Sequence, residues 1–237
     1  MSGLPRARLL ISMFSVAFFG LTTTNFAQAQ SGAVVVGAST TWAKGNYQLT
    51  SLTVNGGATL TVGGGSSVTV TGAVQVTGNS NIVLEAANNT GQVNGTWQGT
   101  GVTINAASVE VDAGSSINAD GQGYAPTAGP GGSTAQYIAG SYGGLGATPA
   151  GSTTVASPVY GSATAPVDLG SGGGPSPSGG IGGSGGGAIR LVVSGTLTNN
   201  GVISANGGGT LNKGSGGTGA GGSVYVTADT LDRKSVV

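Results

Sequence analysis

The chain is dominated by short triplets with apolar residues at both ends, and in most of them a polar residue stands in the middle. Turns rich in Gly, Asn and Ser separate these triplets. Alternation with a period of two predicts β-strands that bury one face. The triplets lie at 52–54, 60–62, 68–70, 74–76 and 82–84, then at 102–104, 109–111 and 117–119, and again within 188–193, 202–203 and 224–226.

The first five triplets recur with a fixed spacing. Leu52 is matched by Val74, and Leu60 by Ile82, so three triplets repeat every 22 residues. This is the length of one three-faced coil of a parallel β-helix, in which successive coils stack. We therefore expect each triplet to cover one face of a coil. Val54 and Val76 should stack inside, while Thr53 and Gln75 should face outward.

A β-sandwich is the competing fold, because Asn55-Gly56 and Asn200-Gly201 suit hairpin turns as well as solenoid corners. Sandwiches are built from longer, antiparallel strands, so the 22-residue repeat favours the solenoid. We predict an all-β protein with a parallel β-helix (β-solenoid) over residues 47–231. Residues 30–46 form an N-terminal cap segment, to which Trp42 and Tyr47 can contribute large rings.

One turn unit occurs twice. Residues 117–123 and 203–209 both read Ile, small polar, Ala, Asp or Asn, Gly, any residue, Gly. Asp, Asn and Gly favour tight turns, so each copy should end a coil and open a glycine-rich loop at the same corner. The loops span 121–187 and 207–222. The longer loop is either disordered or packed along the flank of the β-helix, with Tyr and Leu as anchors.

Composition removes several classes of chemistry. The 237 residues include 50 Gly but neither His nor Cys, which excludes a Ser–His–Asp triad and the usual zinc sites. We expect no cofactor and no metal. If residues 1–29 and 232–237, which are discussed next, are left out, the remaining bases are Lys44, Arg190 and Lys213, against six acids. This acidic balance argues against nucleic acid as a partner.

Both ends differ from the rest. Residues 1–29 have the pattern of a secretory signal peptide: basic Arg6 and Arg8, an apolar core at 9–21 and the small-x-small site at 27–29. We expect export, and no membrane span after cleavage. Residues 232–237 can be encoded by a widely used sequencing adapter read in frame. They are therefore expected to be an artefact, with the rest of the natural protein continuing downstream.

The chain resembles a known group of proteins through 117–123, Gly140-Ser141-Tyr142-Gly143-Gly144, 185–191 and 203–207. These runs are similar to glycine-rich, right-handed parallel β-helix segments of bacterial adhesin-like and autotransporter-passenger-like exported proteins. The resemblance covers roughly residues 47–231 and implies a pectin-lyase-like β-helix at the cell surface or in the medium. It would be outer-membrane-associated in a Gram-negative organism. The chain lacks the Asn-Pro-Asn-Gly-Ile type motif of two-partner secretion proteins.

Two sets of residues are candidates for a site. Glu110 and Asp112 lie two apart on a predicted strand, so they share a face and could form a weak acid pair. Outward acids more often keep a strand soluble and block edge pairing. Tyr124, Tyr137, Tyr142 and Tyr160 lie on the long loop. They could form a contact surface for an extracellular glycan or surface protein, or they could pin the loop in place.

These observations predict a non-enzymatic, exported structural or adhesin-like β-helix segment of a larger, truncated surface or secreted protein. The alternative is the N-terminal part of an exported polysaccharide-acting β-helix enzyme. In that case the active site would lie beyond the truncation.

Overall fold

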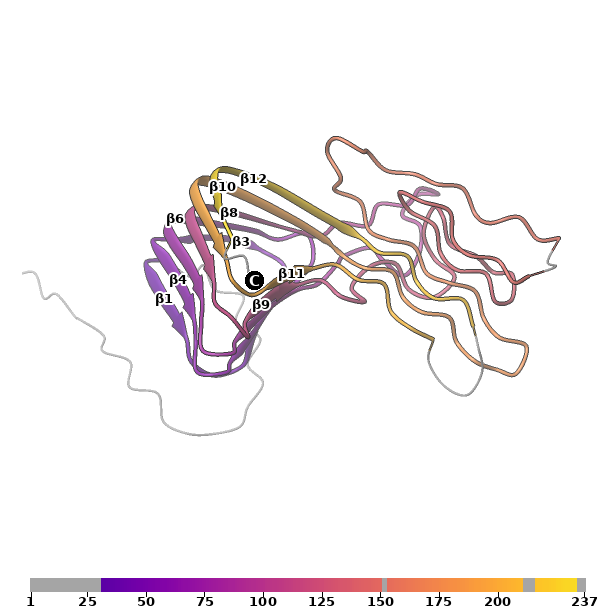
Figure 1. Cartoon of the computed structure of the whole chain (residues 1–237), viewed down its shortest axis with the longest axis horizontal. Helices are drawn as coiled ribbons and strands as arrows, with labels where there is room; N and C mark the ends of the chain where they lie inside the picture. Colours follow the sequence, from indigo (N-terminus) through magenta and orange to yellow (C-terminus); the bar gives the residue numbers. More distant parts are fainter. Residues whose placement is uncertain (1–30, 151–152, 211–215, 234–237) are drawn as a thin grey trace, which may run out of the picture.

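Figure 1 shows the computed structural model of the protein, which describes residues 31–150, 153–210 and 216–233. The predicted signal peptide and residues 234–237 of the tail lie outside the described residues. All secondary-structure elements of the described part are β-strands, and none of it is a helix suited to crossing a membrane. The strands are β1 (Ala33–Val36), β2 (Thr40–Trp42), β3 (Asn46–Leu49), β4 (Ser51–Val54), β5 (Thr59–Val62), β6 (Ser67–Val76), β7 (Asn81–Leu84), β8 (Val102–Val111), β9 (Ser116–Asn118), β10 (Ala188–Asn199), β11 (Val202–Ser204) and β12 (Ser223–Asp232).

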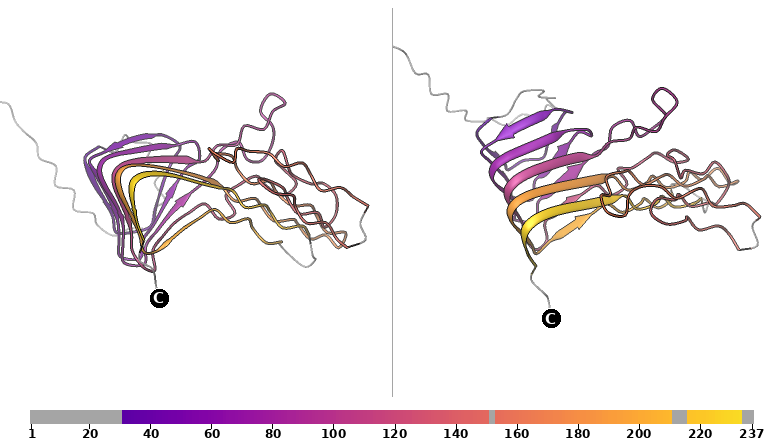
Figure 2. Two further views of the ribbon diagram at one scale, coloured as in Figure 1. Left: turned by 45° about the horizontal axis from the view of Figure 1, so that its top comes forward. Right: turned by 90° about the horizontal axis from the view of Figure 1, so that it is seen from above.

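The strands form two parallel sheets. In the first, the order is β1-β4-β6-β8-β10-β12, with β3 also paired to β6, and in the second it is β11-β9-β7-β5-β2. The strands lie above one another as stacked turns of the chain (Figure 2). Every pairing between these strands is parallel. The described part of the protein is therefore all-β with parallel strands. This arrangement is compatible with a β-solenoid and differs from a β-sandwich built of hairpins.

The 22-residue spacing appears directly in the strand register. β4 pairs with β6 so that Leu52 faces Val74, Thr53 faces Gln75 and Val54 faces Val76. Val54 and Val76 are both fully buried, and Thr53 and Gln75 are partly exposed on the other side of the sheet. β5 and β7 pair with the same offset, with Leu60 opposite Ile82. The predicted inward stacking is confirmed.

The expectation that each strand covers only one face holds for the short strands β1, β3 and β4 of the first sheet but is wrong for its four long strands. β6, β8, β10 and β12 are 10 to 12 residues long. Their ladders shift register between Val70 and Ala73 and between Val193 and Thr196. Glycine allows this bend, because a Cβ at Gly72 would lie 2.6 Å from the carbonyl oxygen of Thr50, between β3 and β4 in the coil below. Two triplets therefore belong to one bent strand.

The core consists of apolar side chains stacked in columns along the rod, which we define as described residues 31–120, 188–204 and 223–233. One column runs through Leu60, Ile82, Ile117 and Ile203. At the first coil Trp42 and Tyr47 stack with ring centroids 4.7 Å apart, and each is only 3% exposed. At the other end β12 pairs with β10 alone, and its Leu231 is 64% exposed. The two ends of the core therefore differ in how far their apolar residues are covered.

The repeated turn unit joins neighbouring coils. Ile117 pairs with Ile203 and Asn118 with Ser204. One oxygen of the Asp120 carboxylate accepts a hydrogen bond of 2.6 Å from the backbone N–H of Asn206, and the other accepts one of 2.9 Å from the Ser204 hydroxyl. The two copies therefore lie one above the other, and both glycine-rich segments leave the rod at the same corner, as the repeat predicts.

We expect replacement of Asp120 by alanine to loosen this corner modestly. The two hydrogen bonds lie at an exposed site, so the free energy of unfolding should fall by about 1 kcal/mol. Chemical denaturation of a chain comprising residues 30–237 measures this loss. Asp229→Ala is the matched control, because Asp229 is exposed and no hydrogen bond to it occurs in the described residues. Equal losses in both variants would contradict a specific role for Asp120.

Candidate functional site

The two glycine-rich segments form one ordered body beside the rod. We call it the bundle: the described residues of 121–187 and 205–222, which project sideways from the rod in Figure 1. Its extended segments are joined by backbone hydrogen bonds without forming named strands. The expectation of a loop lying along the flank is therefore wrong for most of the described loop residues, which pack on each other instead. Composition alone could not distinguish this body from a flexible linker.

Hydrogen bonds radiate from the centre of the bundle in several directions. Residues 169–174 are all buried and bond to four other segments. The carbonyl oxygen of Gly170 accepts from Tyr124, and the N–H of Gly173 donates to Gly183. Further bonds link this segment to Ile138 and Ala220. A strand in a sheet has at most two such neighbours, so the bundle is a three-dimensional network rather than a sheet.

Close backbone contact explains why glycine dominates this network. A Cβ added at Gly173 would lie 2.2 Å from the carbonyl oxygen of Gly217. At Gly185 it would lie 1.8 Å from the carbonyl oxygen of Gly170. Real Cβ atoms do not approach backbone atoms so closely, so these positions exclude every other residue. The glycine content of the bundle is thus a packing requirement.

A small apolar cluster connects the bundle to the rod. It contains Tyr124, Leu169 and Ala188, with Trp97 packed against them. The rings of Trp97 and Tyr124 meet edge to face, with centroids 5.2 Å apart. The hydroxyl oxygen of Tyr124 accepts a hydrogen bond of 3.0 Å from the N–H of Gly99. Tyr124 and Leu169 therefore do act as anchors, at the base of the bundle.

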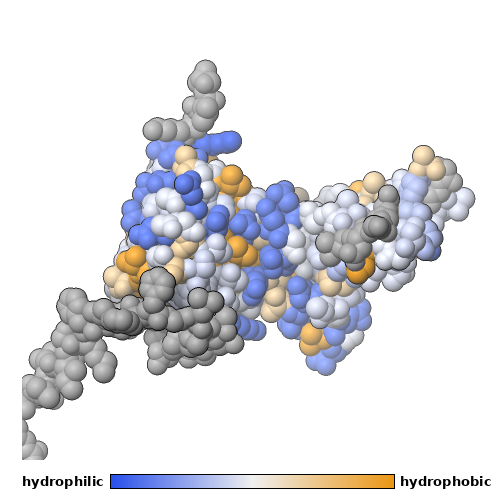
Figure 3. All heavy atoms as spheres, turned by 90° about the horizontal axis from the view of Figure 1, so that it is seen from below, coloured by the Kyte–Doolittle hydropathy of each residue, from blue (hydrophilic) through white to orange (hydrophobic). Residues whose placement is uncertain are grey.

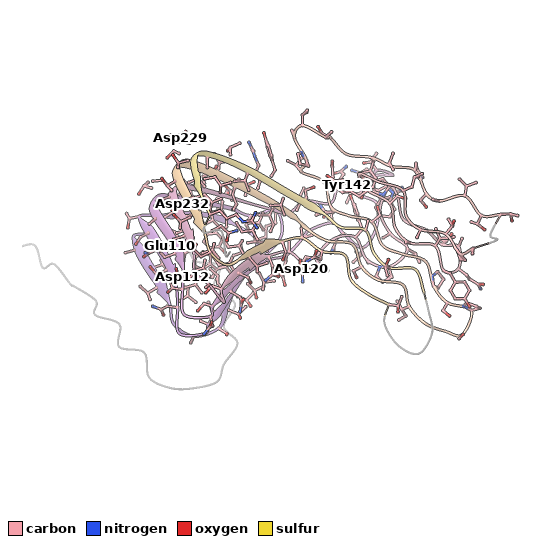
Figure 4. The ribbon with its side chains drawn as sticks, viewed as in Figure 1. Glu110, Asp112, Asp120, Tyr142, Asp229 and Asp232 are labelled. Carbon is pink, nitrogen blue, oxygen red and sulfur yellow. The ribbon has the colours of Figure 1, made fainter. Side chains whose placement is uncertain are left out.

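The structure does not bring the four candidate tyrosines onto one surface. Tyr124 is buried at the junction. Tyr142 and Tyr160 pack edge to face with centroids 5.0 Å apart, and the Tyr142 hydroxyl lies 2.7 Å from that of Ser223. Figure 4 shows Tyr142 within the bundle. Only Tyr137 exposes a substantial fraction of its side chain, 39%, and it adopts a φ of 63° that side chains rarely tolerate.

We expect Tyr160 to make the stability of the bundle sensitive to alkaline pH. Its hydroxyl donates to the carbonyl oxygen of Leu169 and lies 2.7 Å from the hydroxyl of Ser171. Burial raises the pKa of this phenol well above its usual value. The Tyr160 phenol of the unfolded chain therefore loses its proton at lower pH than that of the folded chain. The contribution of Tyr160 to the free energy of unfolding is fully present below about pH 10 and falls as the pH rises toward the folded pKa.

We expect Tyr160→Phe to flatten this alkaline loss. The variant should start less stable, because Leu169 and Ser171 lose a partner, but its stability should fall less between about pH 9 and 11. Denaturant titrations of a Trp42→Phe background, followed by Trp97 fluorescence at the junction, measure the effect at each pH. Parallel pH profiles for both proteins would contradict it.

Glu110 and Asp112 lie on the side of the rod away from the bundle, together with Asp229 and Asp232 (Figure 4). The side-chain amide of Gln75 donates a hydrogen bond of 3.1 Å to Glu110 from the adjacent strand. The described residues contain no group of three or more acidic, His or Cys side chains arranged to hold a metal ion. Here the observed partner of Glu110 is an amide on the neighbouring coil.

A groove that the sequence did not suggest lies on the outer face of the first sheet. Its volume is about 500 Å³, and its lining includes both Lys44 and Arg190 but no carboxylate. The other polar residues of its lining come from successive strands and the turns that precede them: Ser66, Ser67, Thr100, Thr103 and Asn105. Strand register aligns Ser67 with Thr103 and Thr103 with Arg190. The only sequence signal was that bases are rare in this chain.

The cations of this groove have no acidic partner. Neither Lys44 nor Arg190 forms an ion pair within the described residues, and the one recorded contact of Arg190 is with the ring of Tyr225, 6.0 Å from its centroid. Surface charges of this kind normally stay solvated, but here two converge on one concavity. Seen from below the view of Figure 1, the molecule shows a different face, on which hydrophilic and intermediate residues mix with scattered apolar ones (Figure 3).

Comparison with known proteins gives no further guide. No protein-family model matches the chain, and no curated protein or solved structure matches it either.

Proposed function

We propose that this chain is an exported parallel β-helix segment of a larger surface or secreted protein, with a structural and adhesive role. The rod would hold the bundle at a fixed distance and orientation from the surface. The observation that carries this proposal is that the two glycine-rich segments, which are two insertions far apart in sequence, form one ordered body at one corner of the rod. The buried backbone of the bundle favours a display element over a linker.

Adhesion of coated beads tests the proposal. Beads carrying the mature chain are applied to a glycan array with neutral and acidic glycans and to immobilised extracellular matrix proteins. We expect retention that is lost when the bundle is disrupted by Gly185→Ala and kept in Gly143→Ala. Gly143 is the matched control because a Cβ there would meet nothing within 4 Å. Equal retention by both variants, or no retention of the parent chain, would contradict an adhesive role for the bundle.

A further inference from the structure

We propose that the groove containing Lys44 and Arg190 binds a short stretch of an acidic polysaccharide through its carboxylate or sulfate groups. The ligand class follows from the charges, the unused hydrogen-bonding groups and the geometry of the groove. The inference rests on the proposed exported role only in its choice of an extracellular polymer. The binding site itself is on the rod, separate from the bundle.

The charge distribution selects an anion. The described residues contain three bases, and the groove holds two of them, Lys44 and Arg190, without a carboxylate in its lining. Both are free of ion pairs within that part of the chain. The guanidinium can donate two parallel hydrogen bonds to a carboxylate or sulfate, and the ammonium adds a mobile point charge. The rest of the molecule is acidic, so this is where an anionic ligand meets the least repulsion.

The polar lining selects a carbohydrate. The hydroxyls of Ser67, Thr100 and Thr103 and the amide of Asn105 line the groove, and none of these side chains forms a hydrogen bond within the described structure. Such groups match the hydroxyls of sugars, which both donate and accept. Two cations suit a polymer of low charge density. A nucleic acid carries a phosphate at every residue and would be opposed by the acidic surface.

The groove crosses several coils, which sets the orientation of the ligand. Lys44 precedes β3, and the following residues come from β6, β8 and β10 in their order in the sheet. Neighbouring strands are about 4.8 Å apart, so these four strands span about 14 Å. A sugar chain lying across the strands would place about one sugar ring at each strand. Tyr225 on β12 is the register partner of Arg190 on β10 and offers an aromatic ring at the end of this path.

Binding of matched polymers to the mature chain tests the inference. The probes are polygalacturonate against its neutral methyl ester, and dextran sulfate against dextran. We expect at least one acidic polymer to bind, with its neutral counterpart at least tenfold weaker. Binding should weaken when the salt concentration rises from about 0.05 M to 0.5 M, because salt screens exposed charges. The pair that responds identifies carboxylate or sulfate as the recognised group.

Single substitutions then locate the site. Arg190→Gln and Lys44→Gln should each weaken binding about tenfold, as expected for loss of one charged hydrogen-bonding group. The double variant should lose about a hundredfold if the two act independently. Arg233→Gln removes an exposed base outside the groove and should bind normally. Thermal melts confirm that all four variants are folded.

Several results would overturn the inference: no binding to either acidic polymer, equal binding to the neutral polymers, or equal losses in Arg190→Gln and Arg233→Gln. Gly185→Ala separates this site from the adhesive role proposed for the bundle. That variant should keep polymer binding even where bead retention on neutral glycans or matrix proteins is lost. Loss of polymer binding in Gly185→Ala alone, with Arg190→Gln unaffected, would place the ligand on the bundle instead.

Discussion

Replacing Gly185 by alanine is expected to unfold the bundle while leaving the rod intact. The new Cβ would lie 1.8 Å from the carbonyl oxygen of Gly170 and 2.2 Å from its carbon. Both atoms belong to the backbone, so no side-chain rotation can relieve the clash. The N–H of Gly185 also donates to Tyr124, and its carbonyl oxygen accepts from Gly123. We expect a loss of about 3 kcal/mol or more, at the upper end of overpacking effects.

The two tryptophans of the chain report on the two parts separately. Trp97 packs at the junction with the bundle, and Trp42 lies in the first coil of the rod. Denaturation of Gly185→Ala in a Trp42→Phe background should show an early Trp97 transition. In a Trp97→Phe background, the same substitution should change the unfolding transition reported by Trp42 very little. Gly143→Ala, where the added Cβ meets nothing within 4 Å, should change stability by less than about 0.5 kcal/mol. Similar effects of both alanines would refute the close-packed bundle.

Replacing Ile82 by alanine is expected to destabilise the rod by about 2–5 kcal/mol, the usual cost of removing a buried isoleucine side chain. Ile82 is fully buried and lies between Leu60 and Ile117 in neighbouring strands. The stacked column cannot close over the cavity without shifting the backbone hydrogen bonds on either side. The lower stability should appear in equilibrium unfolding followed at Trp42.

Val83→Ala supplies the comparison from the same strand. Val83 neighbours Ile82 but faces outward and is partly exposed, so we expect a loss below about 1 kcal/mol. The contrast tests the assignment of the two faces without changing the strand. If both substitutions cost the same, the alternation of inward and outward residues in β7 would be wrong.

The register of the rod could be predicted because it depends on side chains that repeat. Leu52 and Val74 carry the same inward role 22 residues apart, and the pairing of β4 with β6 follows that spacing. The later coils are harder, because insertions change the offset: Ile82 pairs with Ile117, 35 residues on. Ile117 and Ile203 could still be matched, since the turn unit around them is repeated.

The bent strands and the bundle could not be predicted for a different reason. The bend at Gly72 depends on the position of the carbonyl of Thr50 in the coil below, and a repeat in sequence does not reveal such an approach. The bundle is held by backbone groups, which every residue carries. Its sequence therefore has the composition of a flexible linker, although residues 169–174 are buried.

The candidate site shows the same limit. Lys44 and Arg190 are widely separated in sequence, and only the stacking of β3, β6, β8 and β10 brings them to one groove. The tyrosines could be recognised as conspicuous residues of the loop. Their division into the buried Tyr124 and the exposed Tyr137 depends on how the segments pack.

Because the bundle is assembled from both insertions, it is a single unit for recombination and for protein engineering. The N–H groups of Gly183 and Gly186 donate to carbonyl oxygens of the second insertion, at Gly217 and Ala220. Deleting one insertion would leave such groups in the other without partners, at a cost for each one that remains buried. A graft that exchanges the displayed part must therefore replace both insertions together, with all four crossover points at the same corner of the rod.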